Sequence, residues 1–206
     1  DLSCGKGAEI IRMSDFENAE AFYDYIKEKG FGVVEEYLIN HDKIREVYEP
    51  ALNTMRMITI IGYDNEPHLF FAAQKFGVNG RFIDVHGIHA PIDLETGIVH
   101  FPFHSGNTDT DLIYTKHPDT GYDLTNYEVP MFKEAKEMIL RAAMKVPEMR
   151  YVGWDVAVTN KGPKIVEGND YTAYDYMQLP YQNPSRIGVI PDILKLVPSF
   201  KDELYK

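Results

Sequence analysis

Two acidic residues, Asp155 and Glu167, interrupt a sequence that otherwise predicts an apolar β-hairpin, YVGWDVAVTNKGPKIVEGND at residues 151–170. Acidic side chains are uncommon in strands, and burying an unpaired charge is costly. Asn169 lies two residues beyond Glu167 and therefore on the same face of its strand. Two carboxylates and an amide oxygen are hard ligands, which suit a Mg²⁺ ion whose other positions are filled by phosphate oxygens.

The turn between the two strands decides whether the acids meet. If residues 160–162 form a three-residue loop, Thr159 pairs with Pro163, and counting back places Asp155 directly opposite Glu167. Opposed side chains have Cβ atoms about 4.5–5.5 Å apart, and like charges there repel unless a cation lies between them or one is protonated. The alternative is a half-exposed hairpin whose acids face solvent.

Arg56 is a further candidate because it lies in the apolar run MRMITIIGY, residues 55–63. A buried arginine needs an anionic partner. That partner is either the phosphate of a ligand or a nearby acidic side chain. The opening CGKG contains Gly5, Lys6 and Gly7, a short glycine-rich sequence that alone is more often an ordinary turn.

Five histidines between residues 86 and 117 form another group, which includes the sequence HGIH. A zinc site needs three or four ligands in a defined geometry. In a strand, His86 and His89 would face opposite ways, so surface or hydrogen-bonded histidines are the favoured interpretation. A substrate-contacting role for His86, His89 or Lys116 is left open.

Helices and strands that would position these residues are interspersed along the chain. The sequence predicts helices over residues 14–30, 129–147 and 191–197, and a short helix or turn over 41–48. It predicts strands over 31–39, 54–63, 68–77 and within 82–103, besides the hairpin. Ser14 and Glu17 have capping-box spacing, and Gly30 can end the first helix. Residues 104–128 are turn-rich and predict a surface loop. Antiparallel or mixed sheets with packed helices make the fold class α+β.

The composition excludes several classes of protein. A formal net charge of −11 argues against non-specific binding to nucleic acid. No apolar run approaches the roughly 20 residues that a membrane span needs, and the chain does not open with a secretory leader. The one cysteine, Cys4, excludes an internal disulfide framework and fits a cytoplasmic location.

The hairpin sequence GWDVAVTNKGPKIVEGN, with VVEEYLINH, NTMRMITI and HPDTG before it in that order, resembles the C-terminal part of ATP-grasp proteins. It is most similar to the sugar-transfer-associated ATP-grasp branch, over nearly the whole chain. The resemblance implies two subdomains that hold ATP between them, with Mg²⁺ bridging its phosphates. Residues 1–40 would be the remainder of the lid subdomain, and residues 41–206 the core subdomain with the metal and phosphate site.

The resemblance also implies roles for individual residues. Asp155, Glu167 and Asn169 match metal ligands, and Arg56 matches the arginine that contacts phosphate during transfer. The residues expected to bind nucleotide are Gly5, Lys6 and Gly7 in a loop over the phosphates, Glu35, Glu36, Tyr37 and Leu38 in a hinge whose backbone meets adenine, and His41, or Asp42, near the ribose.

The implied activity is an ATP- and Mg²⁺-dependent ligation of two small molecules, in which a carboxylate becomes an acyl phosphate and an amine-type nucleophile attacks it. The branch name suggests cell-envelope or polysaccharide metabolism. A small-molecule kinase of the same fold and a catalytically incomplete nucleotide-binding module are the alternatives. The family has a phosphate-binding lysine and a further subdomain ahead of the glycine-rich loop, so we expect a preceding segment or a partner chain to supply them.

Overall fold

The computed structural model describes residues 9–84, 86–100, 102–104, 113–170, 172, 177 and 189–197. The chain divides into two compact units, residues 1–39 and residues 40–206. Cys4 and the glycine-rich sequence Gly5, Lys6 and Gly7 lie outside the described residues. The proposed assignment of the two parts of the chain to a lid and a core subdomain therefore stays a prediction.

The first unit contains a short 3₁₀ helix, η1 (Met13–Asp15), and helix α1 (Ala19–Lys29). The predicted capping role of Ser14 is wrong, because Asn18 caps α1: its side chain accepts a hydrogen bond of 2.9 Å from the backbone N–H three residues on. Asparagine is at least as good an N-cap as serine, and it stands directly before the helix. Gly30 ends α1 in the left-handed conformation, as predicted, with φ of 70°.

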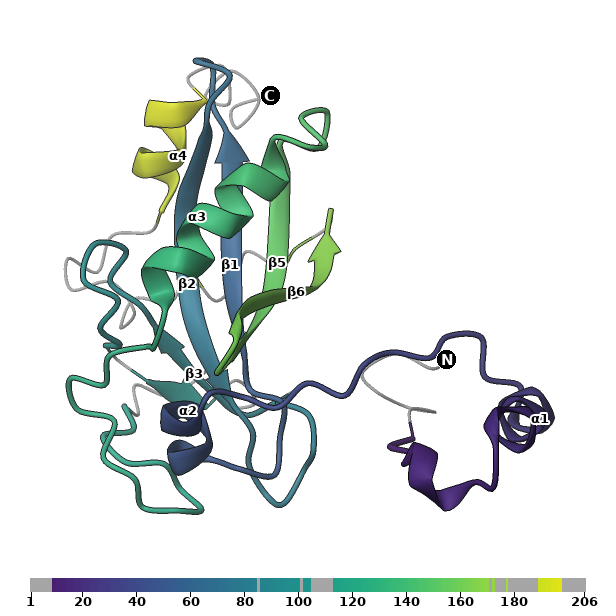
Figure 1. Ribbon diagram of the computed structural model, residues 1–206. Helices are drawn as coiled ribbons and strands as arrows, with labels where there is room; N and C mark the ends of the chain where they lie inside the picture. The colour runs from purple at the N-terminus through teal and green to yellow at the C-terminus, as the bar shows by residue number, and fades with distance from the viewer. Residues whose placement is uncertain are drawn as a thin grey trace. The chain divides into compact units, whose positions relative to one another are not determined.

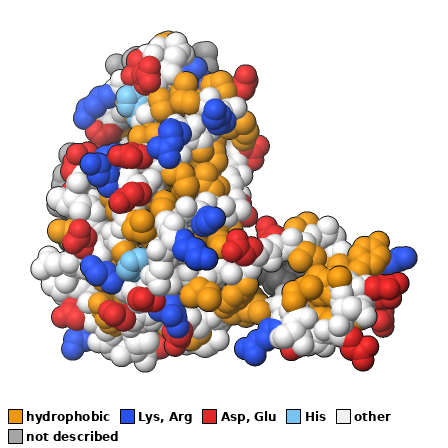
Figure 2. All heavy atoms as spheres, viewed as in Figure 1, with side chains coloured by type: hydrophobic (Ala, Val, Ile, Leu, Met, Phe, Trp, Pro, Cys, Tyr) orange, Lys and Arg blue, Asp and Glu red, His pale blue; other side chains and the backbone are white. Residues whose placement is uncertain are grey.

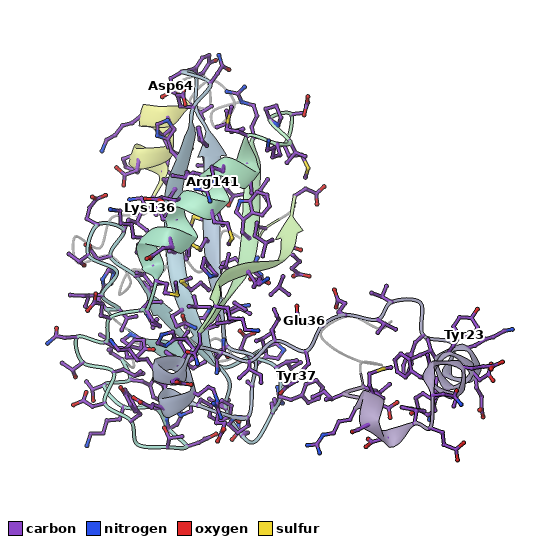
Figure 3. The ribbon with its side chains drawn as sticks, in the orientation of Figure 1. Tyr23, Glu36, Tyr37, Asp64, Lys136 and Arg141 are labelled. Carbon is purple, nitrogen blue, oxygen red and sulfur yellow. The ribbon has the colours of Figure 1, made fainter. Side chains whose placement is uncertain are left out.

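The predicted strand over residues 31–39 is wrong, because the structure has no strand there. Val33 and Val34 are adjacent in sequence and both exposed, so this segment buries neither of its faces. Glu36 and Tyr37 come from the same segment (Figure 3). Hydrophobic side chains gather on the surface of the first unit (Figure 2). A run of β-branched residues forms a strand only when a neighbouring strand satisfies its backbone, and no described segment does so here.

The second unit is built on a six-stranded sheet in the order β4-β3-β2-β1-β5-β6, and every neighbouring pair is antiparallel. The strands are β1 (Thr54–Ile61), β2 (Pro67–Phe76), β3 (Ile88–Pro91), β4 (Phe103–His104), β5 (Tyr151–Thr159) and β6 (Gly162–Asn169). Among the described residues of this unit, the helices are α2 (Asp42–Val47), α3 (Phe132–Ala143) and α4 (Ile190–Leu196). The predicted α+β class is confirmed.

Helix α3 crosses one face of the sheet, over β1, β2 and β5 (Figure 1). It turns Phe132, Ala135 and Ile139 toward the sheet, at the spacing of one helix face. Trp154 of β5 belongs to the same core, and its Nε1 donates a hydrogen bond of 2.9 Å to the hydroxyl of Thr59. Among the described helices, none combines the length and the apolar character that a membrane span needs.

The HPDTG sequence forms a turn in which His117 is buried and the four residues after it are exposed, so the prediction of a surface loop holds here except at His117. His117 is only 1% exposed, and its Nδ1 accepts a hydrogen bond from the backbone N–H two residues on. Its Nε2 therefore carries the proton and donates to the carbonyl of Gly77 at 2.8 Å. The ring stacks on Tyr48, and the Thr120 hydroxyl donates to the carbonyl of the last residue of α2. The interpretation as a hydrogen-bonded histidine is confirmed for His117.

Burial lowers the pKa of His117 below its ordinary value. The unfolded chain therefore takes up this proton first as the pH falls, so the stability due to neutral His117 is complete above about pH 6.5 and is lost on acidification through the folded pKa. We expect the free energy of unfolding in urea to fall as the pH is lowered below about 6.5. His117→Gln should be less stable at neutral pH but should lose less stability on acidification. An unchanged pH slope in the variant would contradict this assignment.

Candidate functional site

Alternate residues of β5 place large apolar side chains against α3 and small or polar ones on the opposite face of the sheet. Val152, Trp154 and Val156 belong to the core under α3, whereas Gly153 and Asp155 face the other way. We call this second face the polar face. Its polar strand residues include Thr54 and Arg56 of β1, Lys75 of β2, His89 of β3, Asp155 of β5, and Lys164, Glu167 and Asn169 of β6.

Arg56 and Asp155 are cross-strand neighbours on β1 and β5 and form a bidentate ion pair. Arg56 Nε lies 2.9 Å from Asp155 Oδ1, and Nη2 lies 3.1 Å from Oδ2. Such pairs are among the stronger charge-assisted hydrogen bonds. The prediction that Arg56 needs an anionic partner is confirmed. The partner in this structure is a nearby acid, and that acid is the residue predicted to bind metal.

Lys75 extends the ion pair into a network of four charges. Its Nζ lies 3.2 Å from Asp155 Oδ1 and 3.3 Å from Asp84 Oδ1. The other oxygen of Asp84 accepts hydrogen bonds of 2.7 Å from both the backbone N–H and the hydroxyl of Thr54. We call Arg56, Asp155, Lys75 and Asp84 the charge network. Its two cations and two anions alternate, so the network carries no net charge.

A glycine at position 153 makes room for a further hydrogen bond to Arg56 of the charge network. Arg56 Nη1 also donates a hydrogen bond of 2.8 Å to the hydroxyl of Thr172, which lies directly over Gly153. A Cβ at position 153 would come within 2.2 Å of that hydroxyl oxygen. Real Cβ atoms do not approach other atoms so closely, so only glycine lets Thr172 reach Arg56.

Gly153→Ala is therefore expected to destabilise the protein by about 1–3 kcal/mol, because the added methyl group must displace Thr172. Chemical denaturation measures the effect. Gly32→Ala is the matched control, because a Cβ there would meet nothing within 4 Å. Equal stability of the two variants would show that the contact between Gly153 and Thr172 is not tight.

The hairpin places Asp155 opposite Glu167, as predicted, but not by the predicted route. Thr159 pairs with Gly162, so the loop has two residues and the predicted three-residue loop is wrong. Gly162 adopts a φ of 122°, which allows this tighter turn. A β-bulge then shifts the register on β6 by one residue at Val166. The two departures cancel, and the acids end up opposed.

Glu167 and Asn169 lie on β6 at the edge of the sheet and are more accessible than Asp155. Glu167 is exposed, and its Oε1 accepts a hydrogen bond of 3.0 Å from Asn169 Nδ2. Asn169 is paired with Gly153 of β5, so no side chain of β5 stands opposite it. The three predicted metal ligands therefore come from neighbouring positions of two paired strands.

The chemistry of these three donors fits Mg²⁺, which prefers hard oxygen ligands. In the part of the chain that the structure describes, no group of three or more His, Cys, Asp and Glu side chains could hold a metal ion. The predicted ligands, two carboxylates and the amide of Asn169, are a different set of donors. Phosphate oxygens of the nucleotide would fill the remaining coordination positions of the metal. Both oxygens of Asp155, however, already accept from Arg56. A metal-binding role for Asp155 thus requires a change of partner and stays a prediction.

The residues predicted to bind nucleotide are placed separately. Glu35, Glu36 and Tyr37 are exposed in the first unit, in a segment without helix or strand that also includes Leu38. These roles stay predictions.

In the second unit, His41 caps α2, because its Nδ1 accepts a hydrogen bond from the backbone N–H of Lys43. The backbone N–H of His41 donates to the carbonyl of Val158 at 2.7 Å. His41 also lines a cavity of about 360 Å³ beside the first turn of α3. The charged lining consists of Lys43, Lys133, Glu95, Glu128 and Glu134. Three acids against two lysines do not favour an anion there.

Sequence reasoning missed Lys75 and Asp84. Lys75 is a cation inside the apolar run HLFFAAQKF, which is the same signal that singled out Arg56. Asp84 lies outside the strands, and nothing in its sequence neighbourhood indicates that it folds back onto β1. His89, for which a substrate contact was left open, pairs with Lys75 across β2 and β3.

Comparison with known proteins gives one finding. No curated protein and no solved structure matches the chain. The family model described as sugar-transfer-associated ATP-grasp matches residues 7–187, which is most of the chain and includes every member of the charge network and all three candidate metal ligands. This assigns the chain to ATP-dependent, nucleotide-binding enzymes of the ligase or kinase type. The chain belongs to the sugar-transfer-associated ATP-grasp family.

Proposed function

We propose that this protein is an ATP- and Mg²⁺-dependent ligase that activates a small-molecule carboxylate as an acyl phosphate, which an amine-type nucleophile then attacks. The observation that carries the proposal is the polar face. There, in a chain of the ATP-grasp family, Arg56 lies beside the opposed pair Asp155 and Glu167. Transfer of a phosphoryl group depends mainly on positioning and charge neutralisation, and this face supplies both cations and hard anionic ligands.

In this proposal the oxygens of Asp155, Glu167 and Asn169 hold Mg²⁺. Bound Mg²⁺ would neutralise and orient the ATP phosphates. Arg56 contacts the transferred phosphoryl group, since its guanidinium presents several donors to oxygen anions and is always charged. Lys75 stays with Asp84 and keeps Asp155 in place.

The residues that would bind the rest of the nucleotide are those that the family resemblance implies. Gly5, Lys6 and Gly7 would close over the phosphates, the backbone of residues 35–38 would meet adenine, and His41 would lie near the ribose. The family's description associates it with sugar transfer, and we propose a substrate from cell-envelope or polysaccharide metabolism. We place the enzyme in the cytoplasm, where ATP is available.

The experiment that tests the reaction is trapping with hydroxylamine. An acyl phosphate reacts with hydroxylamine to give a hydroxamate, so a ligase supplied with ATP, Mg²⁺ and its carboxylate should form one. A kinase that phosphorylates a hydroxyl group would consume ATP without forming a hydroxamate. A protein that binds nucleotide but consumes no ATP with any mixture of small carboxylates would contradict both and favour an incomplete module.

A further inference from the structure

Two positively charged groups, Arg56 and the proposed metal ion, would compete for the carboxylate of Asp155. This carboxylate accepts from Arg56 at 2.9 and 3.1 Å and lies 3.2 Å from Lys75 Nζ. The same oxygens are the proposed metal ligands. A divalent cation at these oxygens would face two positive groups at close range, and their repulsion weakens its binding.

We propose that Asp155 exchanges partners: it pairs with Arg56 in the ligand-free protein and with a divalent cation once the nucleotide is bound, which leaves the Arg56 guanidinium to the phosphate. This inference rests on the proposed function and adds an order of events to it. The protein binds free divalent cations poorly, and the metal arrives with the anionic nucleotide.

The contacts indicate that Arg56, rather than Lys75, is the partner that leaves. The Arg56 side chain is 25% exposed, whereas the Lys75 side chain is 9% exposed. Lys75 has a second acid, Asp84, which Thr54 fixes with two hydrogen bonds of 2.7 Å. Among the described residues, the other hydrogen bond of Arg56 goes to the neutral hydroxyl of Thr172. Lys75 therefore stays paired with Asp84 when Asp155 changes partner, and Arg56 pairs with the phosphate instead.

The charge balance favours the exchange only when an anion is present. With Arg56 in place, the charge network is neutral. When Arg56 turns to a phosphate, Lys75 remains between Asp84 and Asp155, so this part carries one negative charge. Glu167, on the neighbouring strand, adds a second. A cation is then attracted to the face that bound it only weakly before.

The test is binding of Mn²⁺ alone, measured by electron paramagnetic resonance of the free ion. Arg56→Met should bind Mn²⁺ at least about tenfold more tightly than the wild-type chain, a difference of about 1.4 kcal/mol. Arg56→Lys keeps the charge and should bind as weakly as the wild type. Arg45→Met is the matched control: Arg45 lies on α2 and pairs with Asp42 and Glu49, so its loss changes the net charge equally without touching the charge network.

Two results would overturn the inference. If Arg56→Met bound Mn²⁺ no more tightly than the wild type, Arg56 would be a residue that positions Asp155 for the metal rather than competing for it. Arg56→Gln provides the same comparison should Arg56→Met fail to fold. If no protein in the series bound Mn²⁺ even with an ATP analogue, the proposed function itself would fail, and the inference with it. In the expected case, adding Glu167→Gln to Arg56→Met removes the gain.

Discussion

Replacing Lys75 by methionine is expected to lower the free energy of unfolding by about 3–5 kcal/mol. The Lys75 side chain is 9% exposed and lies between Asp84 and Asp155. Methionine would occupy a similar volume but leave the buried Asp84 without the cation that pairs with it, because Arg56 pairs with Asp155. Breaking a buried ion pair on one side is costly because the remaining charge is neither solvated nor paired. Chemical denaturation by urea measures the loss.

Lys136→Met is the matched control for this prediction. Lys136 lies on α3, on the far side of the sheet from the polar face (Figure 3), and its Nζ reaches Leu94 and Glu95. Its side chain is 30% exposed, so we expect a loss of about 1 kcal/mol or less. Adding Asp84→Asn to Lys75→Met should restore part of the stability by removing one uncompensated charge. Equal losses at Lys75 and Lys136 would show that the charge network does not stabilise the fold.

The second large effect concerns binding. Glu167→Gln is expected to weaken Mg²⁺-dependent binding of a non-hydrolysable ATP analogue by at least about tenfold, or about 1.4 kcal/mol. The amide keeps the size of the side chain and its hydrogen-bonding ability, but it removes the charge that attracts the metal. Glu167 is exposed, so the free energy of unfolding should change by no more than about 0.5 kcal/mol. Isothermal titration calorimetry measures the binding.

Glu134→Gln, in the first turn of α3, is the control with the same change of charge at another exposed acid. Unchanged affinity of Glu167→Gln, or an equal loss in both variants, would remove Glu167 from the site. Asp155→Ala is a poorer test than the sequence alone suggests. It would leave Arg56 and Lys75 facing each other without their shared acid, so a loss of binding would be mixed with a loss of stability.

The charge of the polar face could be predicted from sequence only in part. A cation inside an apolar strand requires an anion, and this argument led to Arg56. The same argument applied to Lys75 would have found the second cation. The partner acids could not be chosen from sequence, because Asp84 reaches β1 through a segment outside the strands. That Asp155 pairs with Arg56 follows from the β1–β5 register, which a non-local contact sets.

The hairpin shows how a correct contact can follow from an incorrect turn. Counting from an assumed loop gave the pairing of Asp155 with Glu167, whereas the real loop is one residue shorter and a bulge at Val166 restores the pairing. Alternating residue types carry the information on which face a side chain occupies. They do not determine loop length, and a bulge leaves no clear mark in a strand that is exposed at the sheet edge.

Capping residues in the sequence predicted the end of helix α1 correctly but not its beginning. Gly30 ends α1 as predicted, but Asn18, rather than Ser14, begins it, since two capping residues compete within four positions. The strand predicted over residues 31–39 failed for a different reason. Strand propensity describes fitness for a paired, half-buried surface, and sequence alone does not reveal whether a partner strand is present.

The central claim is that Mg²⁺-nucleotide binds on the polar face at Asp155, Glu167 and Asn169. The most direct measurement is nuclear magnetic resonance of the ¹⁵N-labelled chain with an ATP analogue and substoichiometric Mn²⁺, because the paramagnetic ion broadens the signals of the nearest amides. We expect the amide signals of residues 153–157 and 167–169 to disappear first. Selective broadening of residues 128–134 beside the α3 cavity, with the polar face unaffected, would contradict the claim.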